Sequence, residues 1–265
     1  MAISTFPGQD VGIGAEAAVV SAIQQRMLAL GYGPFNEAVF DENMKSIAML
    51  FQAQHSGAQN MPLVINGDID RQTWVALFGA DTSAVMLEAN ELEAEALRVA
   101  TEQIGQMESP LGSNTGPMVD KYLRSVGIDP NKGSPDDRYW CMAFVYWCFE
   151  QASEALGTSN RLPKTGGCLK HWREAKNIDV ARIVLRKDAY RDPTLLNPGM
   201  IFIMDFGEGY GHTGIVREIS PDGSVRTVEG NTNAHGTRTG VGVFDLRRRT
   251  LSDKMIVGFI SYSLE

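Results

Sequence analysis

The hydrophobic pattern of the first part of the chain predicts a small helical module. Apolar residues recur at helical spacing across residues 15–30 and again across residues 41–57. A third, short helix is predicted to begin after Asp70, whose side chain can cap its N-terminus. Three helices over about 65 residues can just bury a core. We therefore expect an N-terminal tail, residues 1–14, followed by a three-helix domain, residues 15–80.

A longer helical pattern follows, and it begins at the capping residues near Asp81. Acidic side chains cover one side of this helix, and Leu92, Val99 and Ile104 form a thin apolar stripe on the other. Residues 81–111 are therefore predicted to be a helical linker. The same pattern also fits the first helix of the next unit.

The rest of the chain changes from a helical to a strand-like pattern. Helices are predicted over residues 118–126, 141–156 and 168–176, and short β-rich runs over residues 200–204, 213–219, 224–229, 242–246 and 255–262. Pro-Gly, Pro-Asp-Gly and Asn/Gly turns separate these runs. Helices first and an antiparallel meander afterwards predict an α+β domain, residues 112–265, with its helices packed on one sheet.

Charge and composition support two units and exclude several classes of protein. Residues 1–108 carry 4 Lys/Arg and 14 Asp/Glu, whereas residues 109–265 carry 20 and 18. The net charge of −8 disfavours a nucleic-acid-binding protein, because such proteins neutralise phosphates with basic side chains. No apolar run approaches the length of a membrane-spanning helix, so stable membrane insertion is not expected. The first residues lack the features of a secretory signal peptide.

The three cysteines provide the candidate nucleophile. They form no even disulfide set and no CxxC pair, so neither a disulfide scaffold nor a zinc ribbon is predicted. An isolated cysteine is usually a small buried side chain. Cys141 stands at the start of an apolar helix, where unpaired N–H groups favour a thiolate. Cys148 lies on the same helix face and is expected in the core, and Cys168 lies in a Gly-Gly-Cys turn with no obvious partner.

A cysteine nucleophile needs a base, and His212 has the most suitable position. It stands at the start of a predicted core strand, after Gly209-Tyr210-Gly211. The other histidines are expected at the surface, packed beside a tryptophan or in a Gly-rich loop; they are His55, His171 and His235. Glu229 and Asn231 lie two residues apart at the end of the next strand, so both can face His212 across the predicted hairpin.

Four ordered motifs stand out in this domain. They are Trp140-Cys141-Met142-Ala143-Phe144-Val145 with Trp147-Cys148, Asn197-Pro198-Gly199-Met200-Ile201-Phe202, Gly211-His212-Thr213-Gly214-Ile215-Val216 and Val228-Glu229-Gly230-Asn231. Together they resemble the CHAP family (cysteine, histidine-dependent amidohydrolase/peptidase). The resemblance implies a papain-like core that hydrolyses amide bonds in peptidoglycan. It also implies Cys141 as nucleophile, His212 as base, Glu229 as the residue that orients the imidazole, and Asn231 as an assisting residue. The adjacent residues predicted to bind substrate are Trp140, Tyr210 and Gly211.

The N-terminal module carries a second resemblance. Its motifs are Ile23-Gln24-Gln25, Leu28, Gly31-Tyr32, Phe51-Gln52, and Asn66-Gly67 followed by Thr73-Trp74. They are similar to the peptidoglycan-binding domain 1 family, which implies a three-helix module that binds the cell wall. The predicted wall-binding residues are Tyr32, Asn66 and Trp74. The chain departs from the family pattern in the loop after Phe40 and in an inserted stretch, residues 58–62. A helical accessory domain without a ligand is the alternative.

These patterns predict a bacteriolytic cysteine hydrolase without a cofactor, and they assign no metal-binding residues. We expect synthesis in the cytoplasm without a Sec signal and action in the periplasm or cell wall, as a phage endolysin or a type VI secretion effector. Expected partners are peptidoglycan and, for an effector, an immunity protein or a component of the secretion apparatus. The alternatives are a non-catalytic wall-binding or structural protein with a CHAP-like fold, and a cysteine protease acting on ordinary proteins. Loops such as residues 157–167 and 234–240 are expected to select the bond that is cut.

Overall fold

In a computed structural model that describes residues 5–57, 60–80, 87–236 and 240–264, the chain divides into two units. The first unit contains residues 5–57 and 60–80 together with Tyr190–Thr194 and Ser220–Ser224, and the other described residues form the second unit. Each unit has its own set of buried apolar side chains. No helix in the described ranges is long and apolar enough to cross a lipid bilayer.

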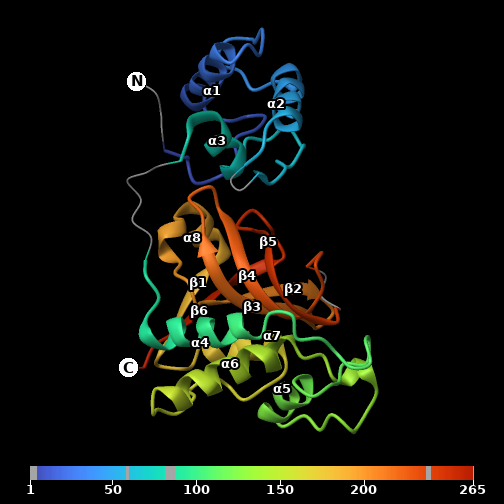
Figure 1. The fold of residues 1–265 in the computed structure, drawn as a ribbon. Helices are drawn as coiled ribbons and strands as arrows, with labels where there is room; N and C mark the ends of the chain where they lie inside the picture. The colour runs from blue at the N-terminus through green and yellow to red at the C-terminus, as the bar shows by residue number, and fades with distance from the viewer. Residues whose placement is uncertain (1–4, 58–59, 81–86, 237–239, 265) are drawn as a thin grey trace. The chain divides into compact units, whose positions relative to one another are not determined.

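Capped helices build the first unit. The described helices are α1 (Ala17–Ala29), α2 (Glu42–Gln54) and α3 (Arg71–Phe78), as Figure 1 shows. The Asp41 carboxylate accepts a hydrogen bond from the Met44 N–H at 2.9 Å, and Asp70 accepts one from the Thr73 N–H at 2.8 Å. Each bond satisfies one of the donors that a helix start leaves unpaired. α2 and α3 therefore begin directly after the aspartates from which the sequence predicts their starts.

Two buried glutamines fasten the loops of this unit. The Gln24 amide donates to the carbonyl oxygens of Asn36 and Val39, at 2.8 and 3.0 Å. The Gln52 amide donates to the Asp68 carbonyl at 2.7 Å and accepts from the Gly67 N–H at 2.9 Å. A loop carries many backbone groups that no helix satisfies, and each glutamine supplies partners for several of them. Gln24 and Gln52, both part of the sequence motifs, thus fix the conformation of the loops that follow α1 and α2.

A six-stranded antiparallel sheet forms the centre of the second unit, with the order β1-β6-β2-β3-β4-β5 among the described residues. The strands are β1 (Ala181–Leu185), β2 (Ile201–Gly207), β3 (Tyr210–Ile219), β4 (Ser224–Thr232), β5 (Gly242–Thr250) and β6 (Ile256–Tyr262). The predicted pairing of β3 with β4 is confirmed, because Ile215 lies opposite Val228. This register places the beginning of β3 beside the end of β4. The residues predicted to do chemistry therefore share one end of the sheet.

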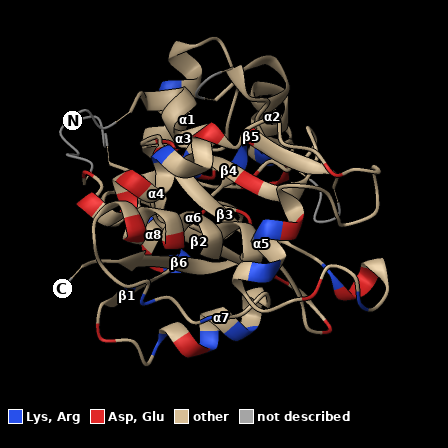
Figure 2. Ribbon diagram, turned by 60° about the horizontal axis from the view of Figure 1, so that its bottom comes forward, with Lys and Arg blue, Asp and Glu red and all other residues tan. Residues whose placement is uncertain are grey.

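Helices cover this sheet and complete the predicted α+β fold. They are α4 (Glu91–Glu102), α5 (Val119–Ser125), α6 (Cys141–Ala155), α7 (Cys168–Ala175) and α8 (Arg186–Arg191). α4, α6 and α7 pack against the sheet and α5 packs against α6, on the side of the sheet that lies below it in Figure 1. Acidic and basic residues are spread over α4, α5 and α7 (Figure 2), whereas the first half of α6 is apolar and buried. α6 is therefore the central helix of this layer.

Two parts of the second unit differ from the sequence-based expectation. α4 begins at Glu91, because Asn90 and Glu93 form a capping box there; the start predicted near Asp81 lies outside the described residues. α4 packs against α6 and belongs to the core of the second unit. β1 and α8 were not predicted. β1 is a five-residue edge strand in which only Val184 is buried, so its hydrophobic pattern is weak.

The close approach of α6 to β4 depends on Gly230. A Cβ atom at this residue would lie 2.7 Å from Cγ of Phe144 and 2.8 Å from the ring of Trp140. Both contacts are too short for carbon atoms held in a packed core, so α6 and β4 would have to move apart. Gly230 thus sets the spacing between the helix that begins with Cys141 and the strand that carries Glu229.

The substitution Gly230→Ala is expected to lower the free energy of unfolding by about 1–3 kcal/mol, because it overpacks this contact. Chemical denaturation measures the loss. Gly167→Ala is the matched control, since a Cβ there would meet its nearest described neighbour at 3.5 Å, an ordinary contact distance. Equal stability of the two variants would contradict the spacing role of Gly230.

Candidate active site

Cys141 is the first residue of α6 and lines a small pocket. The pocket has a volume of ≈ 120 Å³, and its other lining residues are Tyr139, Gly166, Gly167, Cys168, Gly209, Tyr210 and Gly211. The Cys141 side chain is 4% exposed. In the described structure, no side chain caps the start of α6, so its first N–H groups favour negative charge at this cysteine. Tyr210 and Gly211, predicted to bind substrate, line the same pocket.

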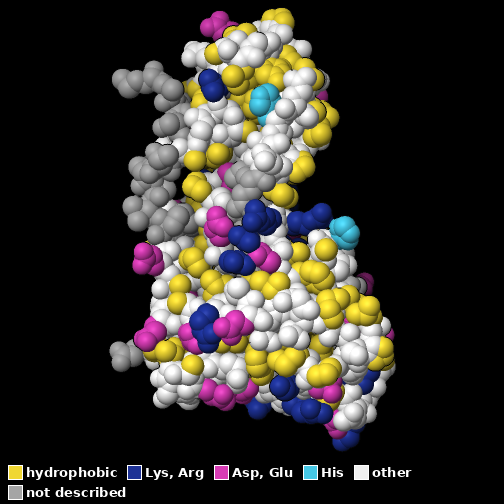
Figure 3. Space-filling view, in the orientation of Figure 1, with side chains coloured by type: hydrophobic (Ala, Val, Ile, Leu, Met, Phe, Trp, Pro, Cys, Tyr) yellow, Lys and Arg dark blue, Asp and Glu magenta, His cyan; other side chains and the backbone are white. Residues whose placement is uncertain are grey.

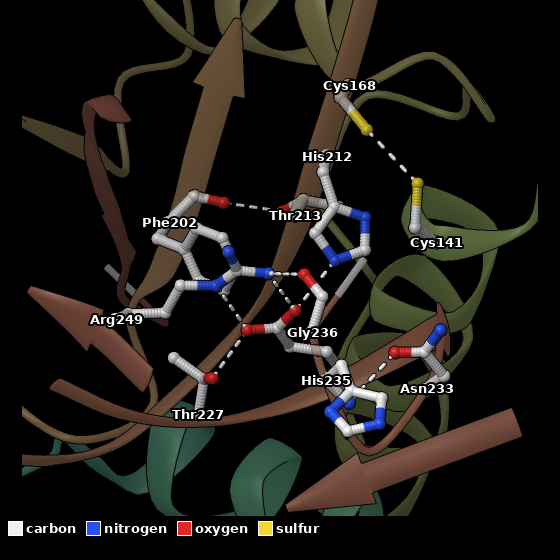
Figure 4. Close-up of polar contacts among 11 residues, drawn as sticks. Cys141, Cys168, Phe202, His212, Thr213, Thr227, Asn233, His235, Gly236 and Arg249 are labelled. Atoms are coloured by element: carbon white, nitrogen blue, oxygen red, sulfur yellow. Dashed lines mark hydrogen bonds and ion pairs between the residues drawn. The ribbon is translucent and has the colours of Figure 1, made fainter. Parts of the chain in front are cut away.

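His212 lies at the beginning of β3, fully buried between Cys141 and Glu229. Its Nε2 atom is 2.7 Å from Oε2 of Glu229. The ring edge with Nδ1 faces the sulfur of Cys141 (Figure 4), and Nδ1 has no hydrogen-bond partner among the described residues. One ring nitrogen is thus held by a carboxylate, and the other is directed toward the thiol of Cys141.

Glu229 is fully buried on β4, and three side chains stabilise its carboxylate. Besides His212, Arg249 of β5 donates from Nε to Oε1 at 2.8 Å and from Nη2 to Oε2 at 2.6 Å, and Thr227 donates to Oε1 at 2.6 Å. A two-point contact of this kind fixes the carboxylate plane as well as its charge. Sequence analysis missed Arg249. The strand predicted there ended at residue 246, whereas β5 runs on to Thr250, so the sequence pattern gave no signal that Arg249 faces the site.

The charges in this cluster shift the pKa values of all three catalytic candidates, Cys141, His212 and Glu229. Burial lowers the pKa of His212, but the Cys141 thiolate and Glu229 outweigh it and raise that pKa to about 9. Burial raises the pKa of Glu229, but Arg249 and His212 outweigh it and lower that pKa to about 2. A hydrogen bond from Cys168, together with His212, holds the pKa of Cys141 well below its usual range. At neutral pH the site is therefore a thiolate beside an imidazolium.

Cys168 does have a partner, contrary to the sequence-based expectation. It is the first residue of α7, and its sulfur lies 3.4 Å from that of Cys141 (Figure 4). Both thiols are free and buried. The hydrogen bond to Cys141 and burial raise the pKa of Cys168 well above its usual range. The sequence places Cys168 in a turn. Its contact with Cys141 forms because the starts of α6 and α7 lie together in the fold, which the turn alone does not predict.

Asn231 and Trp140 are buried next to the start of α6 and hold it in place. Asn231 is 1% exposed, and with its amide oxygen directed at the Trp140 N–H it makes a 3.0 Å hydrogen bond to the residue before Cys141. Trp140 is 0% exposed, and its indole donates to Glu108 at 2.9 Å. The prediction that Trp140 binds substrate is therefore wrong, because its ring is enclosed in the core. Asn231 contacts the start of α6.

The remaining histidines lie away from this cluster. His171 is buried on α7 with its Nε2 atom 3.1 Å from the Tyr262 hydroxyl, and burial lowers its pKa to about 4. His55 stacks on Phe51 in the first unit with ring centres 4.0 Å apart. His235 is exposed, and its ring points away from His212 in Figure 4. His212 is thus the base candidate that the geometry supports.

The family comparison covers this cluster. Residues 133–231 match the CHAP domain family. CHAP domains are generally cysteine- and histidine-dependent amidohydrolases with a papain-like fold, and the matched stretch contains Cys141, His212 and Glu229. Comparison with curated proteins and with solved structures gave no match.

The CHAP match leaves the N-terminal unit outside it, so wall binding by that unit stays a prediction. The hydroxyl of Tyr32 donates to Gln54 at 2.7 Å, and the exposed Asn66 side chain accepts from the Asp68 N–H at 2.9 Å. Trp74 is 1% exposed in the core of the unit. The prediction that Trp74 contacts the wall is therefore wrong, whereas Tyr32 and Asn66 remain accessible.

No cluster of three or more metal-binding side chains occurs among the described residues. In the second unit, the facing side chains of Cys141 and His212 carry opposite charges. The chemistry available to this arrangement is nucleophilic attack by sulfur and proton transfer by imidazole.

The substitution Arg249→Met is expected to destabilise the second unit by about 3–5 kcal/mol, because it leaves the buried Glu229 charge with less compensation. Chemical denaturation followed by tryptophan fluorescence measures this loss. Arg98→Met is the matched control, because its two ion pairs lie on the surface, where solvent screens them and they contribute little to stability. A loss for Arg249→Met as small as that for the control would contradict the role assigned to this arginine.

Proposed function

We propose that the protein is a peptidoglycan hydrolase that cleaves an amide bond of the stem peptide, or the amide that joins it to the sugar. The observation that carries this proposal is the alignment of Cys141, His212 and Glu229 beside an open pocket. The CHAP match supports peptidoglycan as the substrate class.

The first half of the reaction forms a thioester. The Cys141 thiolate adds to the amide carbonyl carbon, and the carbonyl electron pair moves onto oxygen. The first N–H groups of α6, including that of Cys141, are placed to stabilise this oxyanion; loss of one such donor typically costs about 3 kcal/mol. As the intermediate collapses, Nδ1 of His212 gives its proton to the leaving amine. Neutral His212 and an acylated Cys141 remain.

The second half releases the acid product. Nδ1 of His212 accepts a proton from water, and the resulting hydroxide attacks the thioester carbonyl. The C–S bond then breaks, and the sulfur leaves as a thiolate beside the imidazolium. Glu229 stays ionised throughout, because its pKa of about 2 lies far below neutral pH. It keeps the ring in one orientation through both proton transfers.

The first unit is proposed to hold the enzyme on the cell wall. Several of its large apolar side chains are about half exposed, among them Leu28 at 54%, Leu50 at 50% and Ile65 at 54%. Figure 3 shows apolar side chains on the surface of this unit. Exposed apolar groups of this kind fit a surface that binds a ligand. We propose that the enzyme acts in the periplasm or cell wall. It would arrive there either as a phage endolysin or as an injected type VI effector that has its own immunity protein.

Digestion of purified Gram-negative sacculi tests the hydrolase. Cys141→Ala is expected to lower fragment release by at least about a thousand-fold, because the nucleophile is lost. The matched control is Cys148→Ala, on the same helix, where burial alone raises the thiol pKa; it is expected to keep activity within a few-fold. Mass spectrometry of the fragments identifies the bond by its new amino group.

Three outcomes would contradict the proposal. Sacculi left intact by the wild-type protein, and bound equally by Cys141→Ala, would indicate a non-catalytic wall-binding protein. Inactivation by Cys148→Ala with an active Cys141→Ala would show that the nucleophile is misassigned. Casein cleavage in place of sacculus digestion would indicate a protease acting on ordinary proteins.

A further inference from the structure

We propose that Cys168 is a positioning residue for the nucleophile: its thiol donates a hydrogen bond to the Cys141 sulfur and stabilises it as a thiolate directed at His212. This inference rests on the proposed function, in which Cys141 is the nucleophile. It assigns a specific role to a second cysteine of the pocket.

The contact between the two sulfurs has the geometry of a hydrogen bond. They lie 3.4 Å apart, and the two side chains are 4% and 6% exposed. A thiol can donate one hydrogen, whereas a thiolate can only accept. When Cys141 carries the charge, Cys168 is therefore the donor. Water has little access to a sulfur this buried, so the thiol takes the place of a solvating water.

The surrounding charges decide which sulfur is ionised. From β3 the imidazole of His212 faces Cys141, and Glu229, paired with Arg249, contacts the other nitrogen of that ring. From the loops around the pocket, Tyr139 and Tyr210 complete its titratable lining. A positive imidazolium next to Cys141 favours the charge on that sulfur, and Cys168 keeps its proton.

The starts of two helices support the same arrangement. Cys141 begins α6 and Cys168 begins α7, and in the described structure neither helix start has a side-chain cap. Both positive helix ends therefore act on one shared negative charge. The thiol of Cys168 links the start of α7 to a thiolate that belongs to α6.

Gly211 leaves the space that Cys168 needs. A Cβ at Gly211 would lie 3.2 Å from Cβ of Cys168 and 2.8 Å from the Met204 carbonyl oxygen. The glycine before His212 thus lets α7 pack onto β3 at the level of the imidazole. The same segment of β3 that presents the base also admits the second thiol.

The pH dependence of Cys141 alkylation tests this role. The full-length protein, kept reduced by a phosphine, is treated with iodoacetamide, and the adduct on the Cys141 peptide is quantified by mass spectrometry. Cys168→Ala is expected to raise the pH of half-maximal alkylation by about one to two units, because a charge-stabilising hydrogen bond is lost. Cys168→Ser keeps a donor and is expected to restore at least half of the shift. Cys148→Ala is the control and is expected to leave the profile unchanged.

A reciprocal measurement avoids dependence on the folding of Cys168→Ala. In Cys141→Ala, Cys168 is expected to become alkylated at lower pH than in the wild type, because the neighbouring negative charge is gone. Equal profiles for the wild type and Cys168→Ala, or equal shifts for Cys168→Ala and Cys168→Ser, would overturn the proposal. So would an unchanged Cys168 profile in Cys141→Ala. None of these readouts needs peptidoglycan cleavage, so failure of the hydrolase proposal is recognised separately.

Discussion

The buried charge of Glu229 is the constraint on which the second unit depends. A carboxylate without access to water is costly unless other groups neutralise it and fill its hydrogen-bonding positions. Here the partners come from three adjacent strands: His212 from β3, Thr227 from β4 and Arg249 from β5. Correct pairing of these strands is thus required to bury the charge. The same requirement fixes the imidazole in one orientation.

A line of alternating charge extends from this cluster to the pocket. Arg249 is positive, Glu229 negative, the His212 ring positive and the Cys141 sulfur negative, and the Cys168 thiol ends the line as a neutral donor. Each group stabilises the charge of the next, which is why the pKa values of imidazole and nucleophile separate in opposite directions. The nucleophile is therefore prepared for attack before substrate arrives.

The sequence predicts the parts of this site that depend on local pattern. Cys141 begins an apolar helix, and a tight turn makes the strands of His212 and Glu229 neighbours, so their meeting follows from short-range rules. Arg249 and Cys168 reach the site only through the β4–β5 pairing and the packing of α7, which no local pattern encodes. The sequence motifs also contain Trp74, Trp140 and Asn231, but all three side chains are buried. Their contacts lie inside the protein, which a motif alone does not reveal. The fold class was predictable, while the edge strand β1 was not.

Nitrogen-15 NMR of the histidine rings tests the central claim most directly, because it reports which ring nitrogens carry protons. The account predicts that His212 keeps both ring protons through neutral pH and loses one only near the pKa of about 9. It also predicts that this titration moves to lower pH in Cys141→Ala, where the thiolate is missing. A His212 ring that is neutral at pH 7, with the same titration in both proteins, would contradict the thiolate–imidazolium pair.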